Sequence, residues 1–451
     1  MKTSMRCVGM VCCMLASATI SPHAQNKEAA KLKAHFEACI SRGDVLPWTS
    51  EKRIKLSQTE KYRQQVWQAW KMANEASAEE PLLPLAPLSE ASASQWQLPD
   101  SLEPHAVMPY RYGVKEQGEL RTGYPLFIYL HGSGPKRQEW STGLILAQRF
   151  ADGPSLYFIP QIPNEGDYYR WWQKAKQYAW EKLLRLSLAR GDVHPDSIYI
   201  FGISEGGYGS QRLASYYADY LAAAGPMAGG EPLKNAPVEN CANMAFSLRT
   251  GDRDLGFYRN MLTGYTLQAF DSLQQLHPDR YVHRIELIPG RGHAIDYSPT
   301  TPWMKQFARQ PYPRYFCWED FEMDGRHRRG FYNLVVNRRP DGNLRTRYEM
   351  SIEGNQVKLT VDDVHYEVVE KDPYWGIELK FRKSYTPATS GQFTLYFCEE
   401  LLDLTKPITI EVNGKMLFQG MLKPQLKHLV QSCATFFDPR RLYPVAVELS
   451  L

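Results

Sequence analysis

The sequence predicts an α/β fold, with a doubly wound, mostly parallel sheet, an N-terminal helical extension and a C-terminal β-sandwich-like domain. Between about residues 105 and 312, short apolar runs alternate with longer helical stretches, which is the pattern of buried parallel strands covered by helices. From about residue 313 the apolar runs are short, partly alternating and separated by turn residues, as in an antiparallel β domain. The length of 451 residues is enough for two or three domains.

Composition and charge exclude several classes of protein. Hydrophobic residues make up 43% of the chain and charged residues 23%, so a disordered chain or a coiled coil is excluded for the bulk of it. The net charge of +4 is too small for a nucleic-acid-binding protein, which usually has a strongly basic domain. We therefore expect no nucleic-acid partner.

Residues 1–24 have the three-part layout of a secretory signal peptide. Lys2 and Arg6 precede the mostly apolar run Cys7–Ile20, and Ala24 offers a small residue for cleavage. This layout predicts a secreted or periplasmic protein. No later run reaches the roughly 18 apolar residues that a membrane helix needs, so no integral membrane segment is expected after cleavage.

Three of the eight cysteines lie in this segment. Cys12 and Cys13 leave a lipid anchor as the less favoured alternative, because the residues before them form a poor lipid-attachment box. The other five are too few and too widely spaced for a dense disulfide framework, although they allow one or two bridges. No CxxC or Cys/His pair occurs among them, so we expect no metal site. These five are Cys39, Cys241, Cys317, Cys398 and Cys433.

Residues 25–104 are interpreted as a helical leader followed by a linker. Ser57 to Glu60 have the spacing of a capping box at a helix start. Residues 79–99 are rich in Pro, Ser, Ala and Leu, which is typical of a linker or a segment that wraps around a domain. Apolar residues at helical spacing predict a packed face made of Tyr62, Val66, Trp70 and Ala73.

Residues 105–312 form the predicted catalytic domain. Its helical stretches are Trp171–Arg190 and Gly207–Tyr220. Its predicted strands are Pro125–Leu130, Leu156–Ile159, Ser197–Phe201, Ala245–Leu248 and Arg284–Ile288.

Residues 313–451 form the predicted β domain. Asn413-Gly414 lies between two apolar runs, Ile408–Val412 and Met416–Phe418, and such a dipeptide is a strong hairpin signal. Four aromatic residues are interpreted as core anchors, with a carbohydrate-binding face as the less favoured alternative. They are Trp318, Tyr332, Trp375 and Tyr396.

Ser204 is the candidate nucleophile. It is the centre of Gly202-Ile203-Ser204-Glu205-Gly206, which follows a predicted strand and opens a predicted helix. This is the setting of a G-x-S-x-G elbow, where a tight turn lifts a serine hydroxyl above the sheet. A neutral serine needs a base and an acid that orients the base.

His293 is the candidate base and Asp254 the candidate acid, with Asp252 as the alternative acid. Both candidates follow predicted strands in the chain order serine, acid, histidine. Parallel sheets place their sites at these carboxyl ends of strands. Asp254 is preferred because it stands three residues after Gly251.

The candidate oxyanion hole combines two backbone N–H groups. One belongs to Glu205, the residue after the serine, and the other comes from the loop His131-Gly132-Ser133-Gly134 after an earlier strand. The sequence leaves Ser133 and Gly134 open as the second donor.

These motifs resemble the α/β-hydrolase superfamily, within the secreted carbohydrate-esterase branch related to feruloyl and acetylxylan esterases. The run Arg190–Gly207 is similar to the lead into the nucleophile of that branch, and a pectin methylesterase-like activity fits as well. The resemblance covers under half of the chain. It implies Ser204 as nucleophile, His293 as base and Asp254 as orienting acid. The chain departs from the pattern at Glu205, because an acidic side chain there disfavours a developing negative charge.

Cations and aromatic residues near these loops suggest the class of substrate. Arginines favour carboxylate-bearing ligands, and flat rings suit sugars, so we expect a polysaccharide or oligosaccharide ester, with an acidic pectin-type substrate favoured. An equally weighted interpretation is that these arginines only balance nearby acids. The candidate substrate-binding residues are Arg137, Arg170, Trp171, Trp172, Arg253 and Arg291.

The sequence therefore predicts a secreted serine esterase that removes methyl, acetyl or feruloyl groups from plant polysaccharide and needs no cofactor. One alternative is a serine peptidase of the prolyl-oligopeptidase type. The other is a glycan-binding protein whose hydrolase domain is vestigial.

Overall fold

The computed structural model describes residues 22–118, 122–340 and 345–451. The predicted signal peptide lies outside the described residues except for its last three, which begin helix α1 (Pro22–Arg42). None of the helices in the described ranges is long and apolar enough to cross a membrane.

The central sheet has eight strands in the order β1-β2-β4-β3-β5-β6-β7-β8. The two strands at one edge, β1 and β2, run antiparallel to their neighbours, and all the other pairs are parallel. The predicted doubly wound, mostly parallel sheet is therefore confirmed. Its strands are β1 (Ala93–Gln97), β2 (Val107–Lys115), β3 (Tyr124–Leu130), β4 (Ser155–Pro160), β5 (Val193–Ile203), β6 (Ala223–Met227), β7 (Ala245–Gly251) and β8 (His283–Ile288).

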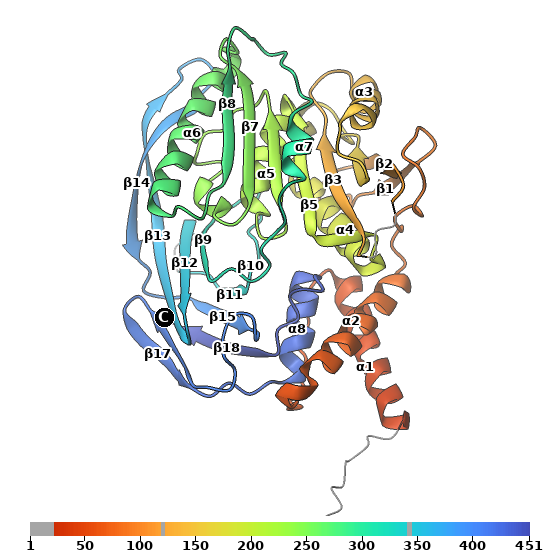
Figure 1. Ribbon diagram of the computed structural model, residues 1–451, viewed down its shortest axis with the longest axis vertical. Coiled ribbons are helices and arrows are strands. Elements are labelled where there is room, and N and C mark those ends of the chain that lie inside the picture. Colours follow the sequence, from red (N-terminus) through yellow and green to blue (C-terminus); the bar gives the residue numbers. More distant parts are fainter. Residues whose placement is uncertain (1–21, 119–121, 341–344) are drawn as a thin grey trace, which may run out of the picture.

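Helices cover both faces of this sheet (Figure 1). Alternate residues along β3 contribute to two different cores: Leu126 and Ile128 belong to one, and Phe127 and Tyr129 to the other. Successive side chains of a strand point to opposite faces of the sheet, and both faces are buried here. The run is therefore apolar at every position instead of alternating with polar residues. The first face packs against α4 (Lys174–Arg190), α5 (Glu205–Tyr216) and α6 (Arg259–Leu276), and the second against α3 (Lys136–Arg149) and α7 (Thr300–Met304).

The N-terminal helices pack against a helix from the far end of the chain. Helix α2 (Thr59–Glu75) follows a single 3-10 turn, η1 (Leu56–Gln58), and contacts both α1 and α8 (Leu426–Phe436). The predicted capping box does not form: the cap residue is Gln58 and its side chain makes no capping bond. The predicted apolar face is confirmed, since Tyr62, Val66, Trp70 and Ala73 are all buried in this three-helix core.

The C-terminal part contains two β-sheets that pack face to face. Trp318 of one sheet stacks on Phe331 of the other with ring centroids 5.3 Å apart, and Tyr348 meets Phe393 at 5.8 Å. This confirms the predicted sandwich-like arrangement. The six-stranded sheet has the order β17-β16-β13-β12-β9, with β14 paired to β13, and the four-stranded sheet has the order β10-β11-β15-β18.

The bounds of these strands are β9 (Tyr315–Asp320), β10 (Gly330–Phe331), β11 (Leu334–Arg338), β12 (Arg345–Glu353), β13 (Gln356–Lys371), β14 (Glu378–Pro387), β15 (Gln392–Phe397), β16 (Ile408–Val412), β17 (Lys415–Gly420) and β18 (Val445–Ser450). The predicted hairpin at Asn413-Gly414 is confirmed: it joins β16 to β17, and both residues have positive φ, 48° and 76°. Two successive left-handed residues are what a two-residue hairpin turn requires.

Three features were not predicted from the sequence. Strand β1 joins the central sheet from within the segment predicted as a linker. The five cysteines of the described ranges are all free and buried, so no disulfide forms among them. Strands β13 and β14 form one long hairpin that runs beside α6 of the central sheet (Figure 1).

Candidate active site

Ser204 lies in the sharp turn between β5 and α5, with φ 58° and ψ −114°. Such a strained backbone at a non-glycine residue is typical of functional sites. Glycines make the turn possible, because a Cβ on Gly202 would collide with the carbonyl of Gly206, and one on Gly206 with the carbonyl of Leu130. The structure thus has the strand–elbow–helix geometry that the motif predicts.

The three candidate catalytic residues form a hydrogen-bonded chain. His293 Nε2 lies 3.0 Å from Ser204 Oγ, and His293 Nδ1 lies 2.7 Å from Asp254 Oδ2. The side chain of His293 is 45% exposed, whereas Asp254 is buried. Asp252 is exposed and follows β7 by one residue, so of the two candidate acids it is Asp254 that contacts the histidine.

Asp254 has a second partner that the sequence analysis missed. Arg259 Nε donates to Asp254 Oδ2 at 2.9 Å, and Arg259 Nη2 donates to Oδ1 at 2.6 Å. Burial alone would raise the pKa of the Asp254 carboxyl, but the hydrogen bonds from Arg259 and His293 lower it. The carboxylate therefore stays ionised and fixed in orientation behind the imidazole.

The loop after β3 presents one unoccupied backbone donor. Gly132 N–H and Gly134 N–H both donate to the carboxylate of Glu139, each at 3.2 Å. In the part of the chain that the structure describes, Ser133 N–H and Glu205 N–H donate to no protein group. Between the two residues left open by the sequence, Ser133 is thus the one with a free N–H, while Glu139 holds the loop in place.

His131 and two aromatic residues support this loop from inside the protein. His131 Nε2 accepts a hydrogen bond from Ile162 N–H and Nδ1 donates to the carbonyl of Gly132, so the ring is neutral. Burial lowers its pKa to about 4. Tyr169 Oη donates to the carbonyl of Gly132 at 2.7 Å.

Trp171 is a correction to the predicted substrate-binding set. Its side chain is fully buried (0% exposed), it packs edge-on against His131, and its Nε1 donates to the carbonyl of His131 at 3.0 Å. A ring enclosed in this way cannot stack on a substrate, so its role is to position the loop.

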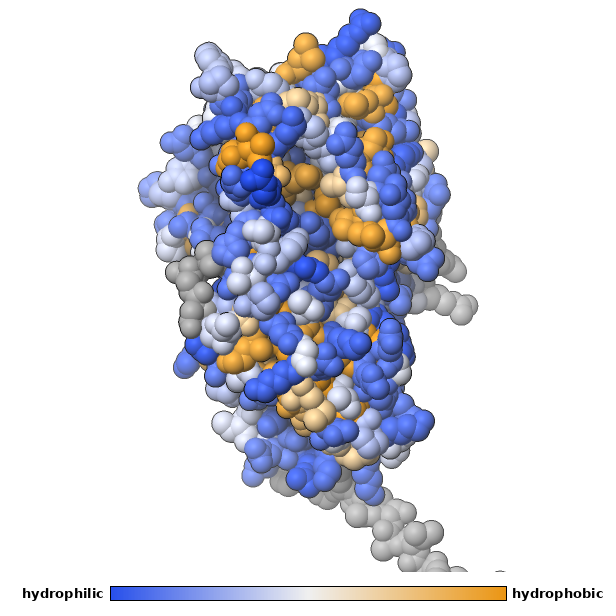
Figure 2. Space-filling model, turned by 90° about the vertical axis from the view of Figure 1, so that its left-hand side faces the viewer, coloured by the Kyte–Doolittle hydropathy of each residue, from blue (hydrophilic) through white to orange (hydrophobic). Residues whose placement is uncertain are grey.

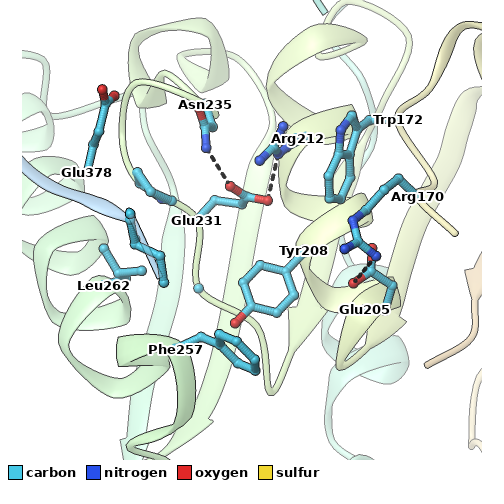
Figure 3. Close-up of a pocket in the computed structure, with 14 residues that line it drawn as sticks. Arg170, Trp172, Glu205, Tyr208, Arg212, Glu231, Asn235, Phe257, Leu262 and Glu378 are labelled. Atoms are coloured by element: carbon cyan, nitrogen blue, oxygen red, sulfur yellow. Dashed lines mark hydrogen bonds and ion pairs between the residues drawn. The ribbon is translucent and has the colours of Figure 1, made fainter. Parts of the chain in front are cut away.

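A cavity of about 400 Å³ opens beside the elbow (Figure 3). Ser204 and His293 are not among its lining residues; the first turn of α5 joins the cavity to the triad through Glu205 and Tyr208. The lining is Arg170, Trp172, Glu205, Tyr208, Arg212, Gly230, Glu231, Pro232, Asn235, Phe257, Leu262, Gly376, Ile377 and Glu378.

The polar side chains of this cavity are mostly paired with one another. Arg212 Nε donates to Glu231 at 2.6 Å, and Asn235 donates to the other oxygen of the same carboxylate at 3.0 Å. The guanidinium of Arg212 lies 3.9 Å from the ring centroid of Trp172, a cation–π contact that fixes the ring. Trp172 lines the cavity and Trp171 does not, so Trp172 is placed to meet a ligand.

Glu205 is the exception among the carboxylates of the cavity. Burial raises its pKa to about 7 against the opposing charge of Arg170, whose Nη1 lies 3.6 Å from Glu205 Oε2. The other oxygen, Oε1, is buried and has no hydrogen-bond partner among the residues that the structure describes. The acidic side chain beside the nucleophile is thus poised between its neutral and charged forms near neutral pH.

The other predicted cations lie outside the cavity. Arg137, Arg253 and Arg291 are exposed, and within the described ranges none of them forms an ion pair. The backbones of Arg253 and Arg291 are joined by a hydrogen bond from N–H to carbonyl at 2.9 Å, so the acid and histidine loops lie side by side. Arg170 alone of the four lines the cavity, and its charge is partly balanced by Glu205.

The structure also brings in residues that sequence reasoning did not select. Arg259, Glu139 and the hairpin residues Gly376 to Glu378 have no motif of their own. Their link to the site is spatial, and the only local signal was the position of Arg259 five residues after Asp254. Within the described ranges, no group of three or more His, Cys, Asp or Glu side chains is placed to hold a metal ion.

Comparison with known proteins finds likeness in structure alone. No family model matches the chain, and no curated sequence matches it significantly. Solved structures that it resembles include a thermostable esterase (20% identity, TM-score 0.38), a carboxylesterase from Mesorhizobium loti (19%, 0.31) and a ferulic acid esterase from Anaeromyces mucronatus (12%, 0.33).

These matches cover 48%, 44% and 48% of this chain. They cover 63%, 93% and 86% of the three matched proteins, in the same order. The chain thus spans less than two thirds of the thermostable esterase. The esterases found are of the kind that the motifs were predicted to resemble. The fold itself follows from this chain's own strand order and from the elbow after β5: its central unit has the α/β-hydrolase fold.

Proposed function

We propose that this protein is a serine carboxylic-ester hydrolase. The observation that carries the proposal is the contact of Ser204 Oγ with His293 Nε2 at 3.0 Å, in a strained elbow and with Asp254 behind the histidine. A vestigial site would have no reason to keep this strained geometry.

The arrangement supports a two-step reaction through an acyl-enzyme. Ser204 Oγ attacks the ester carbonyl while His293 takes the hydroxyl proton, and the N–H groups of Ser133 and Glu205 stabilise the oxyanion. The C–O bond to the alcohol then breaks, and the histidine gives its proton to the leaving oxygen. Water attacks the acyl-enzyme by the same route and releases the acid and the free serine.

For the substrate we propose methyl, acetyl or feruloyl ester groups on plant polysaccharide, with acidic pectin-type polymers favoured and the enzyme itself exported. Arg253 and Arg291 lie on the loops of the acid and the histidine, and Arg137 lies in the first turn of α3, just after the oxyanion loop. All three are exposed and form no ion pair within the described residues, so they can meet carboxylates of an acidic chain. Trp172, Tyr208 and Phe257 supply rings in the adjoining cavity. Export rests on the signal-like residues 1–24.

The first test is hydrolysis of a nitrophenyl acetate by the wild type and by Ser204→Ala. We expect turnover that the variant loses. No turnover by a correctly folded wild type would refute the esterase proposal.

A substrate panel then tests the finer proposal. Methyl-esterified pectin, acetylated xylan, feruloylated oligosaccharide and a peptide are assayed for methanol, acetate, ferulate and amine. Methanol release that weakens with added salt supports the acidic substrate. Release of acetate from neutral xylan alone contradicts it, and amine release would favour the peptidase.

A further inference from the structure

The tip of the β13–β14 hairpin forms one wall of the cavity beside the triad. Gly376, Ile377 and Glu378, at the tip and at the start of β14, line the cavity together with residues of the hydrolase sheet. Figure 2 views the molecule from this side and shows apolar groups interspersed with polar ones around a hollow in its upper half. The C-terminal β domain therefore completes the site and does not merely follow it in the chain.

The tip is tied to the hydrolase by specific contacts. Tyr258 Oη donates to Asp372 Oδ1 at 2.7 Å, and Lys234 Nζ lies 2.8 Å from Glu378 Oε2. The rings of Phe257 and Trp375 meet with centroids 4.7 Å apart. Phe257 and Tyr258 both have positive φ, 53° and 60°, so the segment that meets the hairpin holds a strained conformation between Asp254 and Arg259.

Three aromatic rings are left open to solvent at this junction, and we call them the rim platform: Phe257 (44% exposed), Tyr374 (78%) and Trp375 (56%). Trp375 thus departs from the expected core role, unlike Trp318, Tyr332 and Tyr396, which are buried. The tip that carries it is internally bonded: Asp372 N–H donates to the carbonyl of Ile377 at 2.8 Å, and Gly376 N–H to that of Asp372 at 3.1 Å. Exposed apolar side chains that are grouped in one place mark a binding surface, whereas scattered single ones do not.

The polar groups behind the platform indicate the chemistry of the ligand. Arg212, Glu231 and Asn235 are joined to one another. Within the described residues, the Nη groups of Arg212, the Oδ1 atom of Asn235 and the Oε1 atom of Glu205 make no hydrogen bond to the protein, so the cavity has donors and acceptors to offer a ligand. A fatty acyl chain entering here would desolvate these groups without pairing them, at a cost in free energy. A pyranose ring meets both demands, because its C–H face stacks on an aromatic ring while its hydroxyls bond to carboxylates and amides.

We propose that the rim platform and the adjoining cavity form a saccharide subsite, which binds the sugar rings of the chain that carries the scissile ester. The β domain acts through it as a specificity element. This proposal rests on the proposed ester hydrolase function and assigns the part of the substrate that lies beyond the ester.

The test compares Trp375→Ala and Tyr374→Ala with wild type on a small and on a glycan substrate. The probes are nitrophenyl acetate, acetylated xylo-oligosaccharide, methyl-esterified oligogalacturonide and feruloylated arabino-oligosaccharide. Tyr385→Ala is the matched control, because it removes a partly exposed ring (40%) from the same hairpin outside the cavity lining. We expect each platform variant to raise KM for the hydrolysed oligosaccharide about tenfold, as truncation of a stacking ring does elsewhere.

The same variants should leave kcat/KM for nitrophenyl acetate within about twofold, and Tyr385→Ala should change neither value. Equal KM values for wild type and both platform variants on the oligosaccharides would overturn the subsite, and so would hydrolysis of nitrophenyl acetate with none of the three oligosaccharides turned over. Failure of the wild type on nitrophenyl acetate is a different result, since it refutes the esterase proposal itself.

Discussion

Arg259 binds both carboxylate oxygens of Asp254, with N–O distances of 2.9 and 2.6 Å. A forked pair of this kind fixes a carboxylate in a plane as well as in place. Because Asp254 Oδ2 is also the acceptor for His293 Nδ1, the orientation of the imidazole depends on the arginine.

We predict that Arg259→Met lowers kcat for nitrophenyl acetate roughly 10- to 100-fold, with little change in KM, because a misplaced base costs about this much. Arg259→Lys should recover only part of the rate, since an ammonium cannot form the fork. Steady-state kinetics measure both values. Arg382→Met, which removes an exposed arginine of β14, is the control, and an unchanged kcat in Arg259→Met would contradict a positioning role.

Glu139 should be needed for the rate although it does not reach the substrate. Its carboxylate holds the N–H groups of Gly132 and Gly134 on either side of Ser133. We expect Glu139→Ala to lower kcat roughly 10- to 100-fold through a misplaced oxyanion donor. The exposed Glu75→Gln of α2 serves as control, and a normal kcat in Glu139→Ala would show that the loop holds its shape without the carboxylate.

Glu205 should make the stability of the protein depend on pH. Its pKa is raised from 4.5 to about 7 by burial, so the folded state prefers the protonated form. The contribution of Glu205 to the free energy of unfolding is therefore fully present below about pH 4.5 and is lost as the pH rises through about 7. Its upper limit is roughly 3 kcal/mol.

Glu205→Gln, which cannot ionise, should accordingly be more stable than wild type above pH 7 and should lose the decline between pH 4.5 and 7. Thermal unfolding followed across pH 4 to 9 measures the difference. Glu367→Gln at an exposed site of β13 is the control. Parallel Tm curves for wild type and Glu205→Gln would refute the assignment.

Asp219 should be critical for joining the hydrolase to the C-terminal part. It is fully buried and accepts hydrogen bonds from Arg328 at 2.8 and 3.1 Å and from Arg441 at 2.6 Å. Asp219→Ala leaves two buried guanidinium groups short of a partner, and we expect a loss of about 3–5 kcal/mol in the free energy of unfolding.

Burial alone would raise the pKa of Asp219, but the two arginines lower it. The stabilisation by Asp219 is thus present above the pKa that this group has in the unfolded chain, and it is lost as the pH falls through the pKa in the folded protein. The difference in Tm between wild type and Asp219→Ala should therefore become smaller at low pH. Thermal unfolding at pH 7 and at low pH measures it. The exposed Asp279→Ala should leave Tm unchanged, and an equally stable Asp219→Ala would contradict the prediction.

Several parts of the site could be predicted from sequence because they are local. The elbow at Ser204 is dictated by steric conflict within a few residues, and only glycine at positions 202 and 206 avoids it. The buried strands were visible as short apolar runs. The chain order of Ser204, Asp254 and His293 followed from strands that end at one edge of the sheet.

Other choices depended on side chains that are distant in sequence. Asp254 differs from Asp252 only in the direction that the turn after β7 gives it. Ser133 is the free donor because Glu139 takes the N–H of Gly134. Composition could not tell that Trp171 is enclosed and Trp375 exposed, since both are apolar aromatic residues in short motifs.

The sequence by itself thus determined the sheet, the elbow and the identity of the reacting groups, because strand periodicity and backbone sterics act over a few residues. Only the tertiary structure decided what surrounds those groups: the arginine behind Asp254, the carboxylate under the oxyanion loop and the hairpin that walls the cavity. These come from segments up to about 170 residues away from Ser204. Their contacts form only when the chain folds around the central sheet, and the hairpin wall forms only when the β domain packs against it.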